Sequence, residues 1–152
     1  YFRTLIPKKT EFYLHQFTIK KGSNYYGLIF GTGHTLGMEK FLKVCWEKDK
    51  LSGESNFSMY NDYQPNTHFY NETNTVKIND YKEKIKKAIL TRKISNNLEG
   101  MKHALLNGVP TRTYVEVIEE IKEKIEITGK FNKKITNIHR LKDSDIYKIK
   151  TK

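Results

Sequence analysis

The stretch that decides the fold spans residues 97–125 and reads NLEGMKHALLNGVPTRTYVEVIEEIKEKI. Apolar residues recur with helical spacing over residues 98–105 and again over residues 114–125, which predicts two amphipathic helices with a shared core. Between them, Gly108 suits the end of the first helix and Thr111 can cap the second. The sequence therefore predicts two separate helices joined by a short turn.

The residues that follow predict a basic hairpin. Lysine and arginine crowd residues 130–142, and residues 146–150 alternate apolar and polar side chains as a half-buried strand does. Two helices across a short turn, followed by a hairpin, make up a winged helix, which is a common way to present a helix to the DNA major groove. We therefore expect a basic, winged-helix-like module in this half of the chain.

The helix expected before this pair, over residues 77–93, is strongly cationic. Its apolar residues keep to one side, and its lysines occupy most of the others. Such a helix either rests along a phosphate backbone or exposes its lysines to water. The pattern leaves both interpretations open.

Closer to the N-terminus, the sequence predicts another hairpin. Residues 11–20 alternate loosely, a turn follows at residues 21–24, and residues 25–30 form the second strand. That strand is apolar at consecutive positions, which is typical of a strand covered on both faces. We expect it to belong to a larger sheet whose other strands are missing from this chain. The chain also lacks an initiating Met, so we expect a fragment of a longer protein.

A glycine-rich turn leads from this strand into a helix expected over residues 38–48. Amides at a helix start can hold phosphate, but dinucleotide-binding motifs place their third glycine three positions beyond the second. Gly37 stands four positions beyond Gly33, and no Lys-Ser or Lys-Thr pair follows as in a P-loop. We therefore expect no cofactor in this chain. Residues 49–79 show no sustained period, which predicts a long irregular connector.

Composition excludes several classes of protein. The single Cys45 cannot form an internal disulfide, and its apolar neighbours favour burial. The five histidines are far apart and are not accompanied by cysteine pairs, so the sequence predicts no metal site. No apolar run approaches the roughly 20 residues that span a bilayer, and the sequence does not begin with the charged, apolar and small-residue segments of a signal peptide. We expect a cytoplasmic protein that does not enter a membrane.

Positive charge is concentrated in the C-terminal half. Residues 1–75 hold nine Lys and Arg against seven acids, whereas residues 76–152 hold nineteen against ten, so the halves carry +2 and +9. An excess of this size favours a polyanionic partner, most simply nucleic acid, because each neutralised phosphate releases counterions. The alternative is a solvated, lysine-rich surface.

The residues expected to touch nucleic acid lie at the start of the second helix and on the basic hairpin. Glutamates such as Glu116 and Glu119 occupy the outer surface of that helix, so only its first turn is expected to reach base edges. The hairpin cations are expected to bind phosphates. The predicted contacts are Thr111, Arg112, Thr113, Lys130, Lys133, Lys134, Arg140 and Lys142. DNA is favoured over RNA.

Two stretches carry a resemblance to a known family. One is residues 25–34, YYGLIFGTGH, followed by Gly37 and Met38, and the other is residues 104–110 continued through residues 115–124 to Gly129-Lys130. Together they resemble the C-terminal part of the bacterial three-Cys-motif partner proteins over most of residues 11–140. The resemblance implies an additional, larger domain similar to the doubly wound fold of methyltransferases. It also implies a protein partner with a cysteine motif, and no catalytic residue can be carried over.

The predicted fold class is α+β, with two domains. Residues 1–75 are expected to form the C-terminal edge of a methyltransferase-like α/β domain, with a hairpin, a buried strand, a helix and a long loop. Residues 76–152 are expected to form the winged-helix-like module.

Two other functions stay open on the sequence alone. The chain could complete a methyltransferase-like or nuclease-like enzyme whose active residues lie upstream, since no motif of paired carboxylates and no spaced nucleophile and histidine occurs here. Alternatively, the winged helix could bind another protein, which the glutamate-rich face of its second helix would favour.

Overall fold

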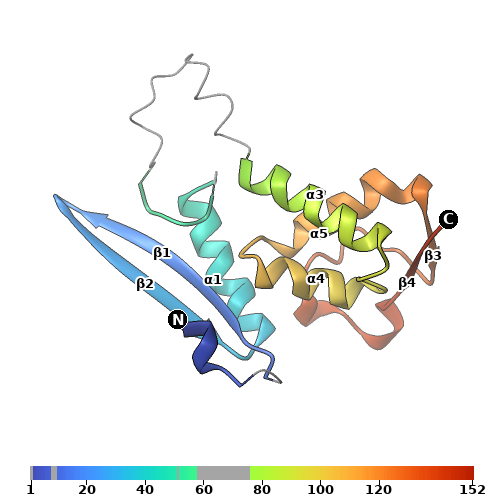
Figure 1. Ribbon diagram of the computed structural model, residues 1–152, viewed down its shortest axis with the longest axis horizontal. Coiled ribbons are helices and arrows are strands. Elements are labelled where there is room, and N and C mark those ends of the chain that lie inside the picture. The colour runs from blue at the N-terminus through green and yellow to red at the C-terminus, as the bar shows by residue number, and fades with distance from the viewer. Residues whose placement is uncertain (1, 8–9, 51, 58–75) are drawn as a thin grey trace, which may run out of the picture. The chain divides into compact units, whose positions relative to one another are not determined.

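The structure is a computed structural model that describes residues 2–7, 10–50, 52–57 and 76–152 (Figure 1). Most of the predicted connector over residues 49–79 therefore lies outside the described residues. The chain divides into two compact units, which we call unit 1 (residues 1–78) and unit 2 (residues 79–152). The α+β class is confirmed, because the structure contains two β-hairpins together with helices.

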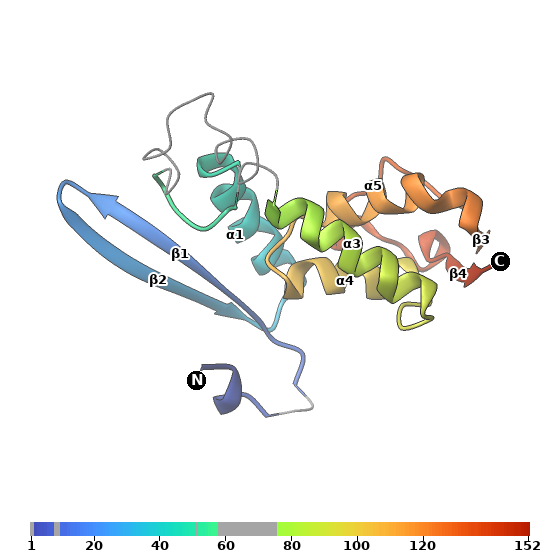
Figure 2. The same ribbon diagram turned by 45° about the horizontal axis from the view of Figure 1, so that its top comes forward.

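Unit 1 consists of a hairpin and a helix that covers one of its faces (Figure 2). A short 3-10 helix, η1 (Phe2–Leu5), precedes strands β1 (Tyr13–Lys21) and β2 (Asn24–Thr32), and helix α1 (Thr35–Lys48) follows them. The strands pair antiparallel along their whole length, from Tyr13 opposite Thr32 to Lys21 opposite Asn24. Gly22 has a φ of +62° in the tight turn, a conformation that glycine adopts at little cost.

The core of unit 1 lies between the hairpin and α1. Alternate β1 residues Tyr13, His15 and Phe17 are buried, as the period of a strand with one covered face requires. The Phe41 ring of α1 stacks on Phe30 with 4.3 Å between centroids and meets His15 edge-on at 6.0 Å. Strand alternation and helix periodicity thus place aromatic rings from both elements in one layer.

Strand β2 is largely uncovered in the described part of the chain. The exposed fractions of Tyr25, Tyr26, Leu28 and Ile29 are 59, 52, 42 and 51%. The sheet has only two strands among the described residues, so the larger sheet predicted for this apolar strand is not seen there. The apolar pattern of the strand is typical of one with a neighbour on each side, but among the described residues only β1 pairs with it.

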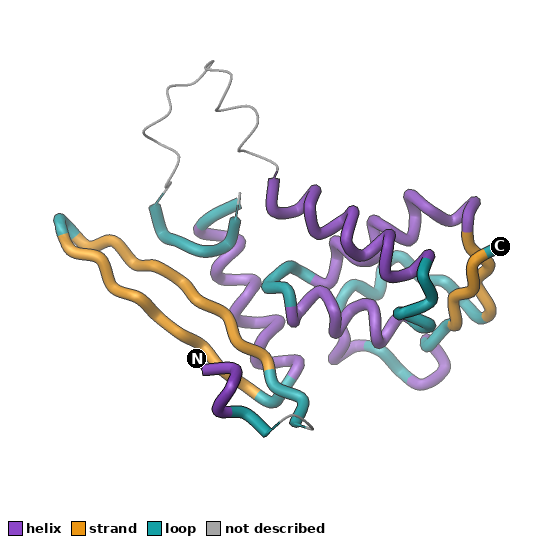
Figure 3. Tube along the Cα trace, viewed as in Figure 1, coloured by secondary structure: helices purple, strands orange, loops and turns teal. Residues whose placement is uncertain are grey.

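Unit 2 is built from three helices and a short terminal hairpin, which Figure 3 colours purple and orange. Helix α3 (Val76–Leu90) begins just before the unit, and α4 (Asn97–Leu106) and α5 (Thr111–Ile121) follow. A 3-10 turn, η2 (Lys122–Lys124), leads into β3 (Ile125–Thr128), which pairs antiparallel with β4 (Lys148–Thr151).

The two predicted helices are separate, and the turn between them is closed by glycine. The Asn96 side chain caps α4 by accepting a hydrogen bond from the Glu99 backbone N–H. Beyond α4, Gly108 takes a φ of +66°, as expected of a glycine that ends a helix. The prediction that Thr111 caps α5 is wrong. Pro110 occupies the cap position, and the Thr111 hydroxyl donates a hydrogen bond to the carbonyl oxygen of Thr136 instead.

The core of unit 2 gathers the apolar faces of all three helices and the hairpin. Tyr114 of α5 is completely buried at its centre, and its hydroxyl lies 3.5 Å from that of Tyr147. The Tyr114 ring lies directly against Gly100 of α4, where a Cβ atom would stand only 2.1 Å from the ring carbon Cε2. The close approach of α4 and α5 therefore depends on the absence of a side chain at residue 100.

The terminal hairpin differs from the prediction in the path of its connection. Between β3 and β4, the chain is irregular and contains two 3-10 turns, η3 (Ile138–Arg140) and η4 (Asp143–Asp145). A further segment lies on the other side of β4, because Asn97 N–H donates to Tyr147 O and Ile149 N–H donates to Ser95 O. Most of the basic residues expected on hairpin strands thus lie on the connection, residues 129–147, which we call the basic connection.

Candidate nucleic-acid interface

The turn between α4 and α5 positions the first turn of α5 at the surface of unit 2. Pro110 has a φ of −57° and precedes the helix, where its missing N–H costs nothing. Arg112 is the second helical residue, and its side chain is 77% exposed. Among the three residues predicted to reach bases, Arg112 is therefore placed to contact a ligand.

The other two residues of that prediction are inside the protein. Thr111 and Thr113 are each only 4% exposed. The Thr111 hydroxyl donates a hydrogen bond to Thr136 O of the basic connection, and this bond holds that segment against the start of α5. Neither side chain can touch a base without local unfolding, so their prediction as contacts is corrected. Helical spacing could have signalled this, because Thr111 and Thr113 flank Tyr114 on the apolar side of α5.

Three of the predicted cations line one pocket of about 370 Å³. Arg112 comes from α5, and Lys133 and Lys134 come from the basic connection. The remaining lining residues are Val115, Glu116, Glu119 and Thr136. The structure thus brings together residues that are more than twenty positions apart in sequence.

Carboxylates neutralise much of the charge in this pocket. Arg112 Nε lies 3.2 Å from Glu116 Oε1, and Lys133 Nζ lies 3.6 Å from Glu119 Oε1. Lys134 is exposed and, among the described residues, has no carboxylate within ion-pair distance. An anion in the pocket could therefore pair with Lys134 directly, whereas it would compete with the glutamates for the other two cations.

Glu116, through its second carboxylate oxygen, and Glu120 face the lysines of α3. Lys82 Nζ lies 3.3 Å from Glu116 Oε2 and 2.9 Å from Glu120 Oε1, and Lys86 Nζ lies 3.0 Å from Glu120 Oε2. Hydrogen bonds from Lys82 and Lys86 hold the pKa of Glu120 below its usual value. The acidic face of α5 thus pairs with α3, and two of the α3 lysines are neutralised rather than available to phosphates.

Lys130, Arg140 and Lys142 are exposed on the basic connection and do not line the pocket. In the part of the chain that the structure describes, none of the three forms an ion pair with a carboxylate. Their charges are therefore exposed at the surface, and their contact with phosphates stays a prediction.

Two further cations at this end of unit 2 were missed by the prediction. Lys148 and Lys150 of β4 are exposed and alternate with the buried Ile149, so their side chains leave the sheet on its outer face. Glu126 stands opposite Lys150 on β3. The alternation of residues 146–150 was recognised as a strand, and the same alternation could have assigned these lysines to the solvent side.

Neither a metal site nor a membrane-spanning helix occurs among the described residues. No group of three or more His, Cys, Asp or Glu side chains is close enough there to hold a metal ion. No helix in the described ranges combines the length and apolarity needed to cross a membrane.

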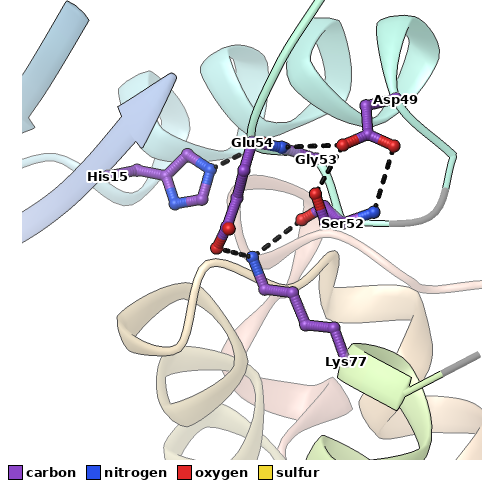
Figure 4. A network of polar contacts seen from close by, with 6 residues as sticks. All are labelled: His15, Asp49, Ser52, Gly53, Glu54 and Lys77. Atoms are coloured by element: carbon purple, nitrogen blue, oxygen red, sulfur yellow. Dashed lines mark hydrogen bonds and ion pairs between the residues drawn. The ribbon is translucent and has the colours of Figure 1, made fainter. Parts of the chain in front are cut away.

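Unit 1 contains a network of polar contacts among titratable side chains that the sequence did not predict (Figure 4). The His15 ring nitrogen Nε2 hydrogen-bonds to Gly53 O at 2.9 Å. Lys77 Nζ donates to Ser52 O at 2.7 Å and to Glu54 Oε1 at 2.6 Å. Asp49 accepts hydrogen bonds from the backbone N–H groups of Ser52 and Glu54. The His15 bond fastens the loop after α1 to the hairpin, the Asp49 bonds close the loop on itself, and Lys77 holds the same loop from the start of α3. We therefore interpret the cluster as structural.

The His15 contact makes the stability of unit 1 depend on pH. Burial lowers the pKa of His15 below its ordinary value of 6.5, because it disfavours the charged ring. The stability that the neutral His15 ring contributes to unit 1 is therefore fully present above the pKa of His15 in the unfolded chain. It is lost as the pH falls through the lower pKa of His15 in the folded protein. We expect the unfolding midpoint, followed by Trp46 fluorescence, to fall as the pH is lowered from about 8 to about 5.

Replacing His15 by glutamine isolates its contribution, because glutamine does not titrate and its amide can still donate a hydrogen bond to Gly53 O. His15→Gln should reduce this pH dependence, whereas His34→Gln, at an exposed histidine, should leave it unchanged. Identical pH dependence in the wild type and His15→Gln would assign the effect to other groups.

In comparisons with protein-family models, curated proteins and solved structures, nothing matches this chain.

Proposed function

We propose that unit 2 is a winged-helix-like module that binds nucleic acid, with duplex DNA as the preferred form. The observation that carries the proposal is a set of exposed cations on the basic connection that lack carboxylate partners among the described residues. These are Lys130, Lys134, Arg140 and Lys142. Uncompensated surface cations gathered on one segment supply the counterion release that drives binding to phosphates.

The order of the elements supports the winged-helix interpretation. Helix α3 is followed by the segment that pairs with β4, then by α4, α5 and the β3–β4 hairpin. The α4–α5 pair with its short turn is the helix-turn-helix part of this arrangement, and the hairpin with the basic connection is the wing. The resemblance to the three-Cys-motif partner proteins stays a prediction.

Within the proposed interface, the residues divide into two roles. Arg112 is the exposed residue in the first turn of α5, and a guanidinium can donate two parallel hydrogen bonds to guanine O6 and N7. The cations of the basic connection bind phosphates and fix the module on the duplex without reading sequence. The Glu116 and Glu120 carboxylates stay paired with α3 and so oppose binding less than free acids would.

The test is fluorescence anisotropy of a labelled duplex of about 20 base pairs, titrated with the full chain over a range of salt concentrations. Log affinity is expected to fall linearly with log salt, with a slope of about −0.9 for each contacted phosphate. Replacing Lys130, Lys134, Arg140 and Lys142 together by Ala should weaken binding at low salt by at least about tenfold and flatten the slope.

A charge-matched control separates an interface from general attraction. Replacing Lys21, Lys40, Lys48 and Lys50 of unit 1 by Ala removes the same net charge from exposed positions outside the proposed interface. This control should keep affinity within about threefold of the wild type. Equal losses in the two variants would contradict a localised interface. Absence of binding at low salt would instead favour the protein-interaction function, for which co-purification of a partner in the presence of nuclease is the measurement.

Arg112 has its own signature in the same assay. Arg112→Ala should reduce the preference for the best duplex from a randomised pool more than it reduces binding to an arbitrary duplex, because a base contact specifies sequence. A uniform loss on all duplexes would make Arg112 another phosphate contact.

A further inference from the structure

The free edge of the β1–β2 sheet can be assigned from its hydrogen bonds. Thr18 of β1 donates its N–H to Glu54 O at 2.7 Å and accepts from Asn56 N–H at 3.0 Å, so both of its backbone groups point away from β2. In an antiparallel pair, such a residue and its partner form a non-hydrogen-bonded pair, and these alternate with hydrogen-bonded pairs along the strands. The partner of Thr18 is Gly27.

The backbone groups of every second β2 residue therefore point to the open side. By this alternation, the residues are Tyr25, Gly27, Ile29 and Gly31. The segment around Glu54 and Asn56 covers the outer edge of β1. Among the described residues of unit 1, β2 is thus the uncovered edge of the sheet.

This edge has none of the features that usually prevent strand pairing. Soluble proteins protect edge strands with charged side chains, proline or bulges. Strand β2 reads NYYGLIFGT, without a charge or a proline, and its register against β1 is continuous over all nine residues. Four of its large apolar side chains are also exposed.

We propose that β2 pairs with β2 of a second copy of this chain, antiparallel and with the two-fold axis at Leu28. In that register Asn24 lies opposite Thr32 of the other copy, so the two nine-residue strands overlap completely. Gly27 then lies opposite Ile29, and every outward N–H and C=O group between Tyr25 and Gly31 meets a partner. A closed, isologous pair results, which leaves no further β2 edge open.

The side chains favour a second copy over an unrelated strand, because β2 is complementary to itself in this register. On the face that carries Phe30 and α1, Tyr26 lies opposite Phe30 of the other copy, and Leu28 lies opposite Leu28. On the opposite face, Ile29 lies opposite Gly27 of the other copy, where no atom stands within 4 Å of the Cβ position. Tyr25 lies opposite Gly31, where the Phe12 and Leu14 side chains of the other copy fill the side-chain position with apolar atoms. Aromatic and apolar cross-strand pairs stabilise such a sheet. The strand also brings no like charges together, although the whole chain carries +11.

The mass of the full chain in solution tests the pairing, measured by sedimentation equilibrium between about 5 and 500 µM. The expected result is a monomer of 18.0 kDa that converts to twice this mass as concentration rises. A monomer over the whole range would overturn the proposal and would favour a strand from outside this chain as the neighbour of β2. A mass that grows without limit would also overturn it, because the proposed contact closes.

A charge swap at the two-fold axis tests the register. Leu28→Lys and Leu28→Glu should each weaken dimerisation at least about tenfold, since each places like charges directly opposite one another. An equimolar mixture of the two variants should regain dimerisation, because the charges are then opposite. Val44→Lys and Val44→Glu, at an exposed apolar residue of α1, are the matched controls and should dimerise like the wild type.

Trp46 fluorescence verifies that unit 1 stays folded in these variants. Folded Leu28 variants that dimerise as well as the wild type, or a mixture that does not recover, would overturn the pairing at Leu28. The result does not depend on the function proposed for unit 2, since no residue of the nucleic-acid interface is changed.

Discussion

Gly100→Ala is expected to destabilise unit 2 severely, although alanine is the better helix former. In an exposed helix this substitution would stabilise by about 1 kcal/mol. In α4, however, the new methyl group would stand 2.1 Å from Cε2 and 2.6 Å from Cδ2 of Tyr114. The Tyr114 ring is completely buried, so it cannot swing into solvent. Either α4 must separate from α5 or the ring must leave its rotamer, and we expect a loss of at least about 3 kcal/mol.

Denaturant unfolding of the full chain followed by helical circular dichroism measures this loss. Gly37→Ala in α1 is the control, because the atoms nearest to its new Cβ belong to the Thr32 side chain and begin at 3.1 Å. Combining Gly100→Ala with Tyr114→Leu should recover part of the loss relative to the sum of the single variants, since leucine lacks the ring atoms that clash. A Gly100→Ala variant as stable as the wild type would show that α4 and α5 are packed differently.

Gly53→Ala is expected to have the corresponding effect on unit 1. Gly53 has a φ of +66°, which costs about 1 kcal/mol for a residue with a Cβ atom. That atom would also stand 2.5 Å from Nε1 of the Trp46 indole. Displacing the loop would break the hydrogen bond between His15 and Gly53 O as well. We expect a total loss of about 3 kcal/mol.

Gly22→Ala separates the two causes of that loss. Gly22 has nearly the same φ, +62°, but nothing lies within 4 Å of its Cβ position. Unfolding followed by Trp46 fluorescence should therefore show a loss of about 1 kcal/mol for Gly22→Ala and a clearly larger one for Gly53→Ala. Equal losses would mean that the Trp46 contact contributes nothing.

Local periodicity predicted most of the elements. The hairpin expected at residues 11–30 is β1–β2, and the helices expected at residues 38–48 and 77–93 are α1 and α3 with shifted ends. Gly108 has the positive φ expected of a helix-ending glycine. These features depend on the conformational preferences and spacing of residues only a few positions apart, which can be read from the sequence.

The candidate interface was predicted only in part, because exposure depends on contacts between distant residues. Thr111 is buried, and its hydroxyl donates a hydrogen bond to Thr136 O, twenty-five positions away. The sequence placed the α5 glutamates on the outer surface of the helix, but it could not identify their partners. The structure pairs Glu120 with Lys82, thirty-eight positions away. Periodicity describes which residues share a face but not what that face contacts.

The sequence by itself determined the α+β class, the basic character of the C-terminal half and the short turn between α4 and α5, because composition and short-range spacing are sufficient for these. Only the tertiary structure decided which cations remain unpaired and which threonines are buried. It also decided that β2 has an open edge among the described residues. The physical reason is that charge pairing, burial and strand pairing are set by groups far apart along the chain, which folding alone brings within a few ångströms.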